Sequence, residues 1–168
     1  MSFFDGRFTI QAAAASGLEA VLKRELISLG YAPRGAEYGR IPFEGNMSDV
    51  ARANVFLRTA GRVRIVLDSF DARTFDELFE NVHSVDWREI LPADAKIVVT
   101  AKSQKSNLFS LSDIQSIVKK AIADRLCTAY GVNRLAETGA VYEIETCIID
   151  DRATLALDTS GAGLHKRG

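Results

Sequence analysis

The stretch Lys96-Ile-Val-Val-Thr-Ala-Lys-Ser-Gln-Lys-Ser-Asn-Leu-Phe-Ser-Leu-Ser-Asp-Ile-Gln115 decides the fold of the second half of the chain. The apolar, β-branched run 97–101 predicts a buried strand. Ser112 and Gln115 have the spacing of a helix capping box. After them an apolar stripe at helical spacing predicts a long helix that ends near Leu126. A strand that leads through a polar loop into a helix indicates an α/β arrangement.

The loop between this strand and helix is a candidate anion site. Backbone N–H groups at a helix start have no partner inside the helix, and they favour phosphate. The same wiring is ordinary in α/β proteins, so a purely structural interpretation stays open. The candidate phosphate-binding residues are Lys102, Lys105, Ser106 and Ser110 in the loop, with Lys119 and Lys120 along the helix.

The remaining second half predicts a small α/β layer in the order α-β-α-β-β. Thr74 and Glu77 form a capping box that opens a helix through Val82. A short turn is expected at 86–91, before Pro92. Strands at 141–149 and 153–157 predict a hairpin around 150–152.

The first half predicts the order β-α-β-β-α-β. Strands are expected at 8–14, 31–36, 40–44 and 62–70, and helices at 16–30 and 48–60. Ser16 and Glu19 have capping-box spacing at the first helix. This order is the split βαβ, or ferredoxin-like, arrangement. We expect a boundary near Asp71 and an overall α+β or α/β class.

The composition is typical of a folded chain, and its charges nearly cancel, so no overall positive field attracts a polyanion. The 168 residues are 47% hydrophobic, and 21 basic side chains nearly balance 22 acidic ones. Nucleic-acid binding would therefore need a local patch. Arg58, Arg62 and Arg64 form a second basic group, for which a solvated strand and helix edge is the preferred interpretation over RNA binding.

Other functional classes lack their signatures. Cys127 and Cys147 have no zinc-ligand spacing, and we expect no metal site, no disulfide and a cytoplasmic location. No apolar run has the length of a membrane span. His83 and His165 are too far apart to read as a ligand pair, and no GxSxG, HExxH or P-loop motif occurs. The GxG turn in 155–163 is not followed by enough chain for a dinucleotide-binding helix.

Four stretches together resemble one family. The chain is similar to the N-terminal part of THUMP-containing class I RNA methyltransferases, in the group of bacterial large-subunit ribosomal RNA guanine methyltransferases. The stretches are Ser16-Gly-Leu-Glu-Ala-Val-Leu-Lys-Arg-Glu-Leu26, Ala53-Asn-Val-Phe-Leu-Arg-Thr-Ala-Gly-Arg-Val63, Val85-Asp-Trp87 with Ala101-Lys-Ser103, and Leu157-Asp-Thr-Ser-Gly-Ala-Gly-Leu-His-Lys-Arg-Gly168.

The resemblance implies a ferredoxin-like domain at 1–70, a THUMP RNA-binding domain at 71–160, and the start of a linker to a methyltransferase domain at 161–168. It implies that the parent enzyme uses S-adenosylmethionine to methylate guanine in ribosomal RNA. The family's glycine-rich cofactor loop and its Asn/Asp-Pro-Pro-aromatic motif are absent, since Pro33, Pro42 and Pro92 are isolated. We therefore expect RNA as partner, no cofactor bound by this chain, and a catalytic domain outside it.

Two alternatives remain at this point. Ferredoxin-like folds also serve as protein-interaction or ligand-sensing modules, and the balanced charge favours that class. THUMP proteins also include enzymes of thiouridine and pseudouridine chemistry, although the C-terminal Gly-Leu-His-Lys-Arg-Gly run favours methyl transfer.

The phosphate-site hypothesis makes a direct prediction. Replacing Lys102, Lys105 and Lys119 together with alanine should weaken RNA binding. With fewer phosphates neutralised by lysines, fewer counterions are released from the RNA when the protein binds. The thermal midpoint should stay nearly unchanged, since surface substitutions usually cost within about 0.5 kcal/mol. Filter binding and a thermal melt test both parts, and undiminished RNA affinity would show that the wrong surface was chosen.

Overall fold

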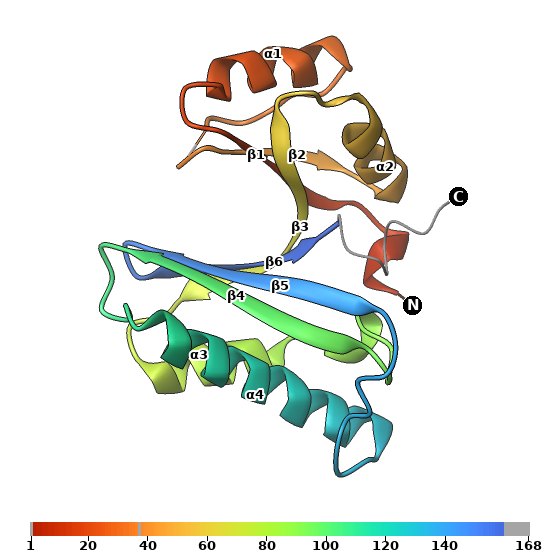
Figure 1. The fold of residues 1–168 in the computed structure, drawn as a ribbon, viewed down its shortest axis with the longest axis vertical. Coiled ribbons are helices and arrows are strands. Elements are labelled where there is room, and N and C mark those ends of the chain that lie inside the picture. Colours follow the sequence, from red (N-terminus) through yellow and green to blue (C-terminus); the bar gives the residue numbers. More distant parts are fainter. Residues whose placement is uncertain (1, 37, 160–168) are drawn as a thin grey trace.

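The computed structural model describes residues 2–36 and 38–159, in which six strands form one sheet and four α-helices pack against it (Figure 1). The strand order is β2-β1-β3-β6-β5-β4, and only the β4–β5 pair is parallel. The strands are β1 (Phe8–Ala14), β2 (Arg40–Gly45), β3 (Ala60–Asp71), β4 (Lys96–Gln104), β5 (Val141–Ile149) and β6 (Arg152–Asp158). The helices are α1 (Glu19–Ser28), α2 (Met47–Phe56), α3 (Phe75–Ser84) and α4 (Leu111–Tyr130), with short 3₁₀ turns at Phe3–Asp5 and Trp87–Glu89.

Strand β3 joins the two halves of the chain. The first part of this strand pairs with β1, from Ala60 to Ile65, and the part from Arg64 to Asp71 pairs with β6. The register shifts between Val66 and Asp68, which places a bulge at Leu67. A bulge bends its strand and increases the local twist. The halves therefore share one twisted sheet, with the bend at their junction.

One face of this sheet is apolar across all six strands. The register aligns Phe43, Ile10, Ile65, Leu157 and Ile144 on that face, from β2 through to β5. Leucine, valine and isoleucine side chains of α1 to α4 pack onto it. The alternate side chains of the strands face the other way, and we call that side the open face.

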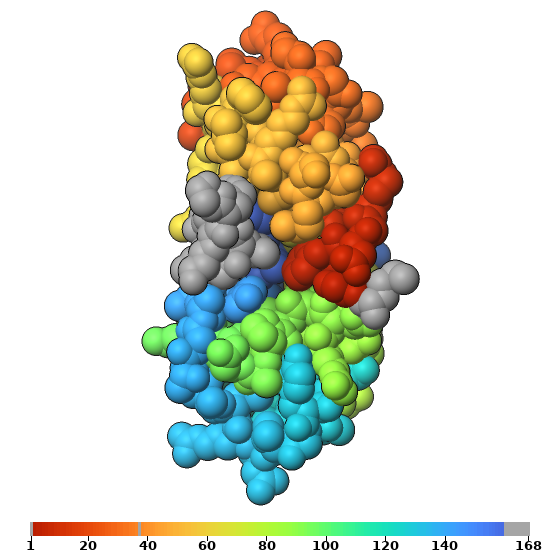
Figure 2. All heavy atoms as spheres, turned by 90° about the vertical axis from the view of Figure 1, so that its right-hand side faces the viewer, coloured from red at the N-terminus to blue at the C-terminus, as the bar shows by residue number. Residues whose placement is uncertain are grey.

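The core has two clusters on the apolar face. One lies under α1 and α2, and the other under α3 and α4 (Figure 1). Phe3, Phe4 and Leu67 contact both clusters. Figure 2 shows the N-terminal residues, in red, lying between the upper and lower parts of the molecule. The N-terminal phenylalanines therefore help to close the junction.

The open face is strongly concave. Strands β2 and β5 are separated by three strands in the sheet order, which in a flat sheet would place their backbones about 19 Å apart. Nevertheless Arg40 of β2 donates a hydrogen bond from Nη2 to Oε2 of Glu145 of β5, at 2.9 Å. The sheet must curl toward its open face for these side chains to meet.

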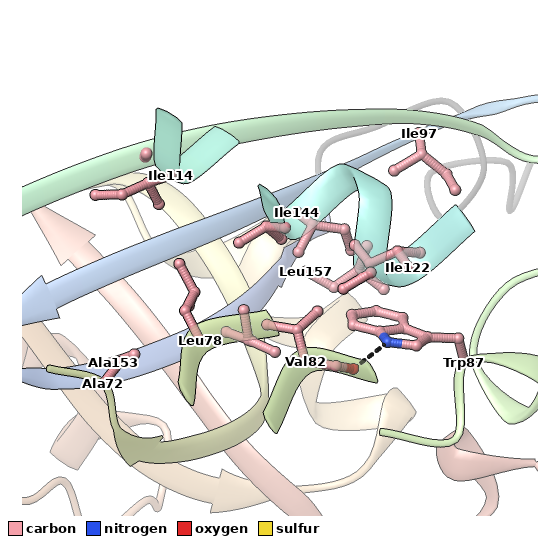
Figure 3. Close-up of a cluster of buried hydrophobic side chains, with 14 of the residues drawn as sticks. Ala72, Leu78, Val82, Trp87, Ile97, Ile114, Ile122, Ile144, Ala153 and Leu157 are labelled. Atoms are coloured by element: carbon pink, nitrogen blue, oxygen red, sulfur yellow. Dashed lines mark hydrogen bonds between the residues drawn. The ribbon is translucent and has the colours of Figure 1, made fainter. Parts of the chain in front are cut away.

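Trp87 anchors the larger cluster. Its side chain is fully buried, and its Nε1 donates a 2.8 Å hydrogen bond to the carbonyl oxygen of Val82, at the end of α3 (Figure 3). The indole lies among Ile122 and Leu157, from helix and sheet (Figure 3). This packing fixes α3 against α4 and the sheet.

Most predicted elements are confirmed. The second half has the predicted order α-β-α-β-β, and the hairpin turns at Asp150 and Asp151, both with positive φ. The Thr74 capping box forms, with the Glu77 N–H donating to Thr74 Oγ1 at 3.1 Å. The predicted linker 161–168 lies outside the described residues. No helix among the described residues is both long and apolar enough to span a bilayer.

Two capping boxes were predicted wrongly. Helix α1 begins after Leu18, and Glu19 instead accepts a hydrogen bond from the Gly17 N–H at 2.8 Å. Helix α4 begins two residues earlier than the box requires, because Ser110 is its N-cap and Ser112 already lies in the first turn. A box that was not predicted, Asn46 with Asp49, opens α2.

The strand predicted at 31–36 is absent among the described residues, so the first half reads β-α-β-α-β there. Pro33 has no N–H to donate, and this segment makes one backbone bond to β2, from Arg34 N–H to the Pro42 oxygen at 2.8 Å. The Tyr31 N–H instead closes α1 on the Leu26 oxygen. Strand β4 runs on to Gln104, beyond the predicted 97–101, because its pairing with β5 continues that far.

Replacing Trp87 with phenylalanine should destabilise the protein by about 2–4 kcal/mol, because it leaves a cavity and removes the hydrogen bond from the indole to the Val82 carbonyl oxygen. The free energy of unfolding in urea measures this loss. Val55→Ala is the control, since Val55 is 68% exposed and should change stability by less than about 0.5 kcal/mol. Equal effects of the two changes would contradict the role given to Trp87.

Candidate functional site

The open face carries a cluster of charged side chains where the curl brings β2, β3 and β5 together. They come from alternate strand positions, opposite to the apolar core. The cluster consists of Arg40, Arg62, Arg64, Glu143, Glu145 and Asp158, with Lys102 at its edge.

Glu145 is the centre of the cluster. It is 3% exposed and receives hydrogen bonds from both terminal nitrogens of Arg40, while Arg64 Nη2 lies 3.4 Å from its Oε2. Burial alone would raise the pKa of Glu145, but the Arg40 hydrogen bonds and the charges of both arginines outweigh burial and lower it. Glu145 is therefore ionised and shared between two guanidiniums.

Arg62 holds a second pair of carboxylates. Its Nη1 lies 3.1 Å from Glu143 Oε2 and also contacts Asp158. The hydrogen bond between Glu143 and Asp158, together with burial and the charge of Asp158, raises the pKa of Glu143. Glu143 is therefore protonated more readily than Glu145.

A cavity of about 360 Å³ opens beside these side chains. Arg40, Arg62, Arg64 and Lys102 line it, together with the backbone around Gly39 and Gly61 and the side chain of Cys147. A smaller hollow of about 120 Å³ shares Arg40 and Cys147 and continues toward Arg152 and Thr154. Together they form a groove across the open face, which we call the arginine cleft.

The predicted loop residues do not all lie together. Lys102 is inside β4, and its side chain belongs to the arginine cleft. Lys105 is exposed just after the strand. Ser106 donates to the Gln104 oxygen and accepts from the Asp151 N–H, so its hydroxyl shapes the loop. Ser110 is the N-cap of α4 and makes no side-chain capping bond.

An acidic side chain occupies part of the predicted phosphate site. Asp151 Oδ1 accepts from the Asn107 N–H at 2.8 Å, which uses one of the loop's free donors. Leu108 is buried, and Phe109 is 78% exposed rather than a core residue. The loop therefore offers Lys105 and an exposed aromatic ring more than a nest of N–H groups.

Lys119 and Lys120 lie away from this loop. Lys119 Nζ is 3.3 Å from Glu137 Oε1, and the same carboxylate oxygen accepts from the Ile97 N–H. Ile97 is near the start of β4, about 26 Å along the strand from Lys105. The six predicted residues therefore fall into two groups, and their role in binding stays a prediction.

The ion network itself cannot be read from the sequence. The sequence indicates Arg62 and Arg64 as part of a basic group, but it shows neither the side of the sheet on which they lie nor that Glu143 and Glu145 are their partners. Arg58 lies apart from the cleft, where its N–H donates to Glu25 at 3.0 Å. The signal that was available is the alternation of charge with apolar residues in Arg62-Val-Arg-Ile65 and Glu143-Ile-Glu-Thr146. No cluster of potential metal ligands occurs among the described residues.

Replacing Glu145 with glutamine should destabilise the protein by about 3–5 kcal/mol near pH 7, because it leaves two buried guanidiniums without their carboxylate. The folded pKa of Glu145 is below its ordinary value of 4.5, so its contribution is complete above that pH and is lost as pH falls through the folded pKa. Urea unfolding at several pH values should therefore show less acid sensitivity in Glu145→Gln than in the wild type.

Glu143→Gln is the matched control on the same strand face. The pKa of Glu143 is raised in the folded state, so protonation of this carboxylate favours folding. Removing it by Glu143→Gln should therefore not reduce the loss of stability at low pH. Equal acid profiles for the wild type and Glu145→Gln would refute the assignment of the buried charge.

Two family models match this chain. The model of the RlmL ferredoxin-like domain matches residues 9–64, and the THUMP domain model matches residues 72–158. The first match ends at residue 64, inside β3, and the second begins at residue 72, just after this strand ends, so most of the strand that both halves share lies between them.

Similar proteins carry methyltransferase names. YpsC of Bacillus subtilis (strain 168), named as an RNA methyltransferase, is 44% identical over 164 residues, and a ribosomal RNA large subunit methyltransferase K/L of Pseudomonas entomophila (strain L48) is 30% identical over 163. The alignments cover 96% of this chain but 42% and 22% of those proteins. The chain thus spans less than half the length of these relatives.

A solved structure confirms the arrangement. The crystal structure of a protein from Listeria monocytogenes str. 4b F2365, named as a predicted N6-adenine-specific DNA methylase, is 51% identical with a TM-score of 0.88. The match covers 98% of this chain and 43% of that one. The chain belongs to the THUMP domain family, with an RlmL ferredoxin-like domain in front of its THUMP domain.

Proposed function

We propose that this chain is the RNA-binding, substrate-recognition region of a class I methyltransferase that uses S-adenosylmethionine. The observation that carries the proposal is the THUMP match over residues 72–158, supported by relatives that are named RNA methyltransferases. The proposed domains are ferredoxin-like at 1–70 and THUMP at 71–160.

The RNA contact would be mainly electrostatic. Lys102 and Lys105 lie three residues apart at the end of β4, within about 10 Å of each other, and both side chains are exposed. Phosphate contacts by such lysines supply most of the affinity of RNA-binding modules. Phe109 adds an exposed ring on which a base can stack. Lys119 and Lys120 form a second, more distant contact along α4.

The proposed substrate is a guanine of ribosomal RNA, supported by the ribosomal RNA methyltransferase K/L relatives and by the family resemblance. The methyl donor would be held elsewhere in the protein. None of the four connections from a strand to a helix in the described residues contains more than one glycine, so none resembles a glycine-rich cofactor loop. The contribution of this chain is to bind and orient the RNA.

Filter binding of ribosomal RNA fragments, unrelated RNA and duplex DNA at several salt concentrations tests this function. We expect the logarithm of the RNA-binding constant to fall linearly with the logarithm of the salt concentration. We also expect ribosomal RNA fragments to be bound more tightly than unrelated RNA. Duplex DNA is included because the Listeria relative is named as a DNA methylase. Lys102→Ala with Lys105→Ala should weaken RNA binding more than Lys119→Ala with Lys120→Ala, because Lys119 is paired with Glu137.

Absence of salt-linked retention would overturn the proposal and favour a protein-interaction module. Preference for duplex DNA would overturn the choice of RNA. An equal loss from both double substitutions would contradict the ranking of the two lysine groups.

A further inference from the structure

Arg64 is the under-compensated charge of the arginine cleft. Its residue is 7% exposed, and its Nε has no hydrogen-bond partner among the described residues. Its ion pair with Glu145 is 3.4 Å long, and Glu145 is already held by two bonds from Arg40. Burial lowers the pKa of Arg64, whereas the pKa values of Arg40 and Arg62 are raised by their carboxylates. A buried donor of this kind favours an added acceptor.

The whole cleft has an excess of positive charge. It brings together four cations, Arg40, Arg62, Arg64 and Lys102, against three carboxylates, Glu143, Glu145 and Asp158. The raised pKa of Glu143 weakens the negative side further. Lys102 is exposed at the rim, and no ion pair to it is found in the described part of the chain.

The cleft has room for a ligand next to these donors. Its volume of about 360 Å³ far exceeds the roughly 30 Å³ occupied by one water molecule in the liquid. Gly39 and Gly61 line it without side chains, so a ligand can approach the backbone there. Guanidinium and ammonium groups donate hydrogen bonds and accept none, so the donors that line the cleft favour a ligand that carries hydrogen-bond acceptors.

We propose that the arginine cleft is a phosphate subsite, in which the guanidinium group of Arg64 and the ammonium group of Lys102 hold a phosphodiester group of RNA. This inference rests on the proposed RNA-binding function and places one backbone phosphate on the concave open face. Lys105 and Phe109 at the end of β4 then contact neighbouring nucleotides. Arg40 and Glu145 are positioning residues, because they hold the curl that brings Arg64 and Lys102 to the same cavity.

The first test uses inorganic phosphate and the 168-residue chain. Phosphate should stabilise the folded state by RT ln(1 + c/Kd), where c is the phosphate concentration, so the thermal midpoint should keep rising with the logarithm of phosphate concentration above Kd, because phosphate binds the folded state alone. The rise should be lost in Arg64→Gln and reduced in Lys102→Ala. Lys96→Ala is the matched control, since Lys96 is a lysine on the same strand and the same sheet face, about 20 Å from Lys102.

The second test uses RNA and the same variants. Arg64→Gln and Lys102→Ala should each weaken binding about 3–10-fold at physiological salt and lower the salt slope by about one. Lys96→Ala should match the wild type. Circular dichroism checks folding; Arg64→Gln leaves Glu145 bonded to Arg40, and Lys102→Ala changes an exposed residue.

The outcomes separate the two proposals. RNA binding that is unchanged in both variants would overturn the phosphate subsite and leave the RNA-binding function standing. No RNA binding by the wild type would overturn the function, and phosphate stabilisation that is lost in Arg64→Gln would then identify a site for free phosphate. No effect of phosphate together with equal RNA affinities would reduce the cluster to a purely structural role.

Discussion

The contact between Arg40 and Glu145 is the interaction on which the open face depends. It joins β2 to β5 across three intervening strands, so it exists only in a sheet that curls. Two buried ions are costly to desolvate, and their mutual attraction repays that cost only in good geometry with further bonds. The two hydrogen bonds from Arg40 and the nearby charge of Arg64 supply that geometry. The apolar core on the other face drives folding, whereas this contact fastens the curled sheet across its open face.

Curvature and function are linked by the position of charge. In a flat sheet Arg40, Arg64 and Lys102 would be spread over separate strands in water, where each would contribute little. The curl gathers them around one cavity and places three carboxylates among them. A chain with a net charge of −1 thereby acquires a local positive cleft.

The sequence predicted what local periodicity controls. Helix α4 and the hairpin of β5 and β6 follow from apolar spacing and from the turn at Asp150-Asp151. The pairing of β3 with β6 joins residues more than eighty positions apart, and no local pattern encodes it. For the same reason Arg62 and Glu143 were visible as alternating charges, but not as partners. The distance of Lys119 from the loop follows from the helix rise, about 13 Å over the nine residues from Ser110.

The sharing of β3 has a mechanical consequence. A strand that is hydrogen-bonded to β1 along one part and to β6 along the other cannot leave either neighbour without disturbing both. We therefore expect the two family domains to unfold as one unit. An isolated piece ending at residue 64 would lack the bulge and the whole pairing with β6.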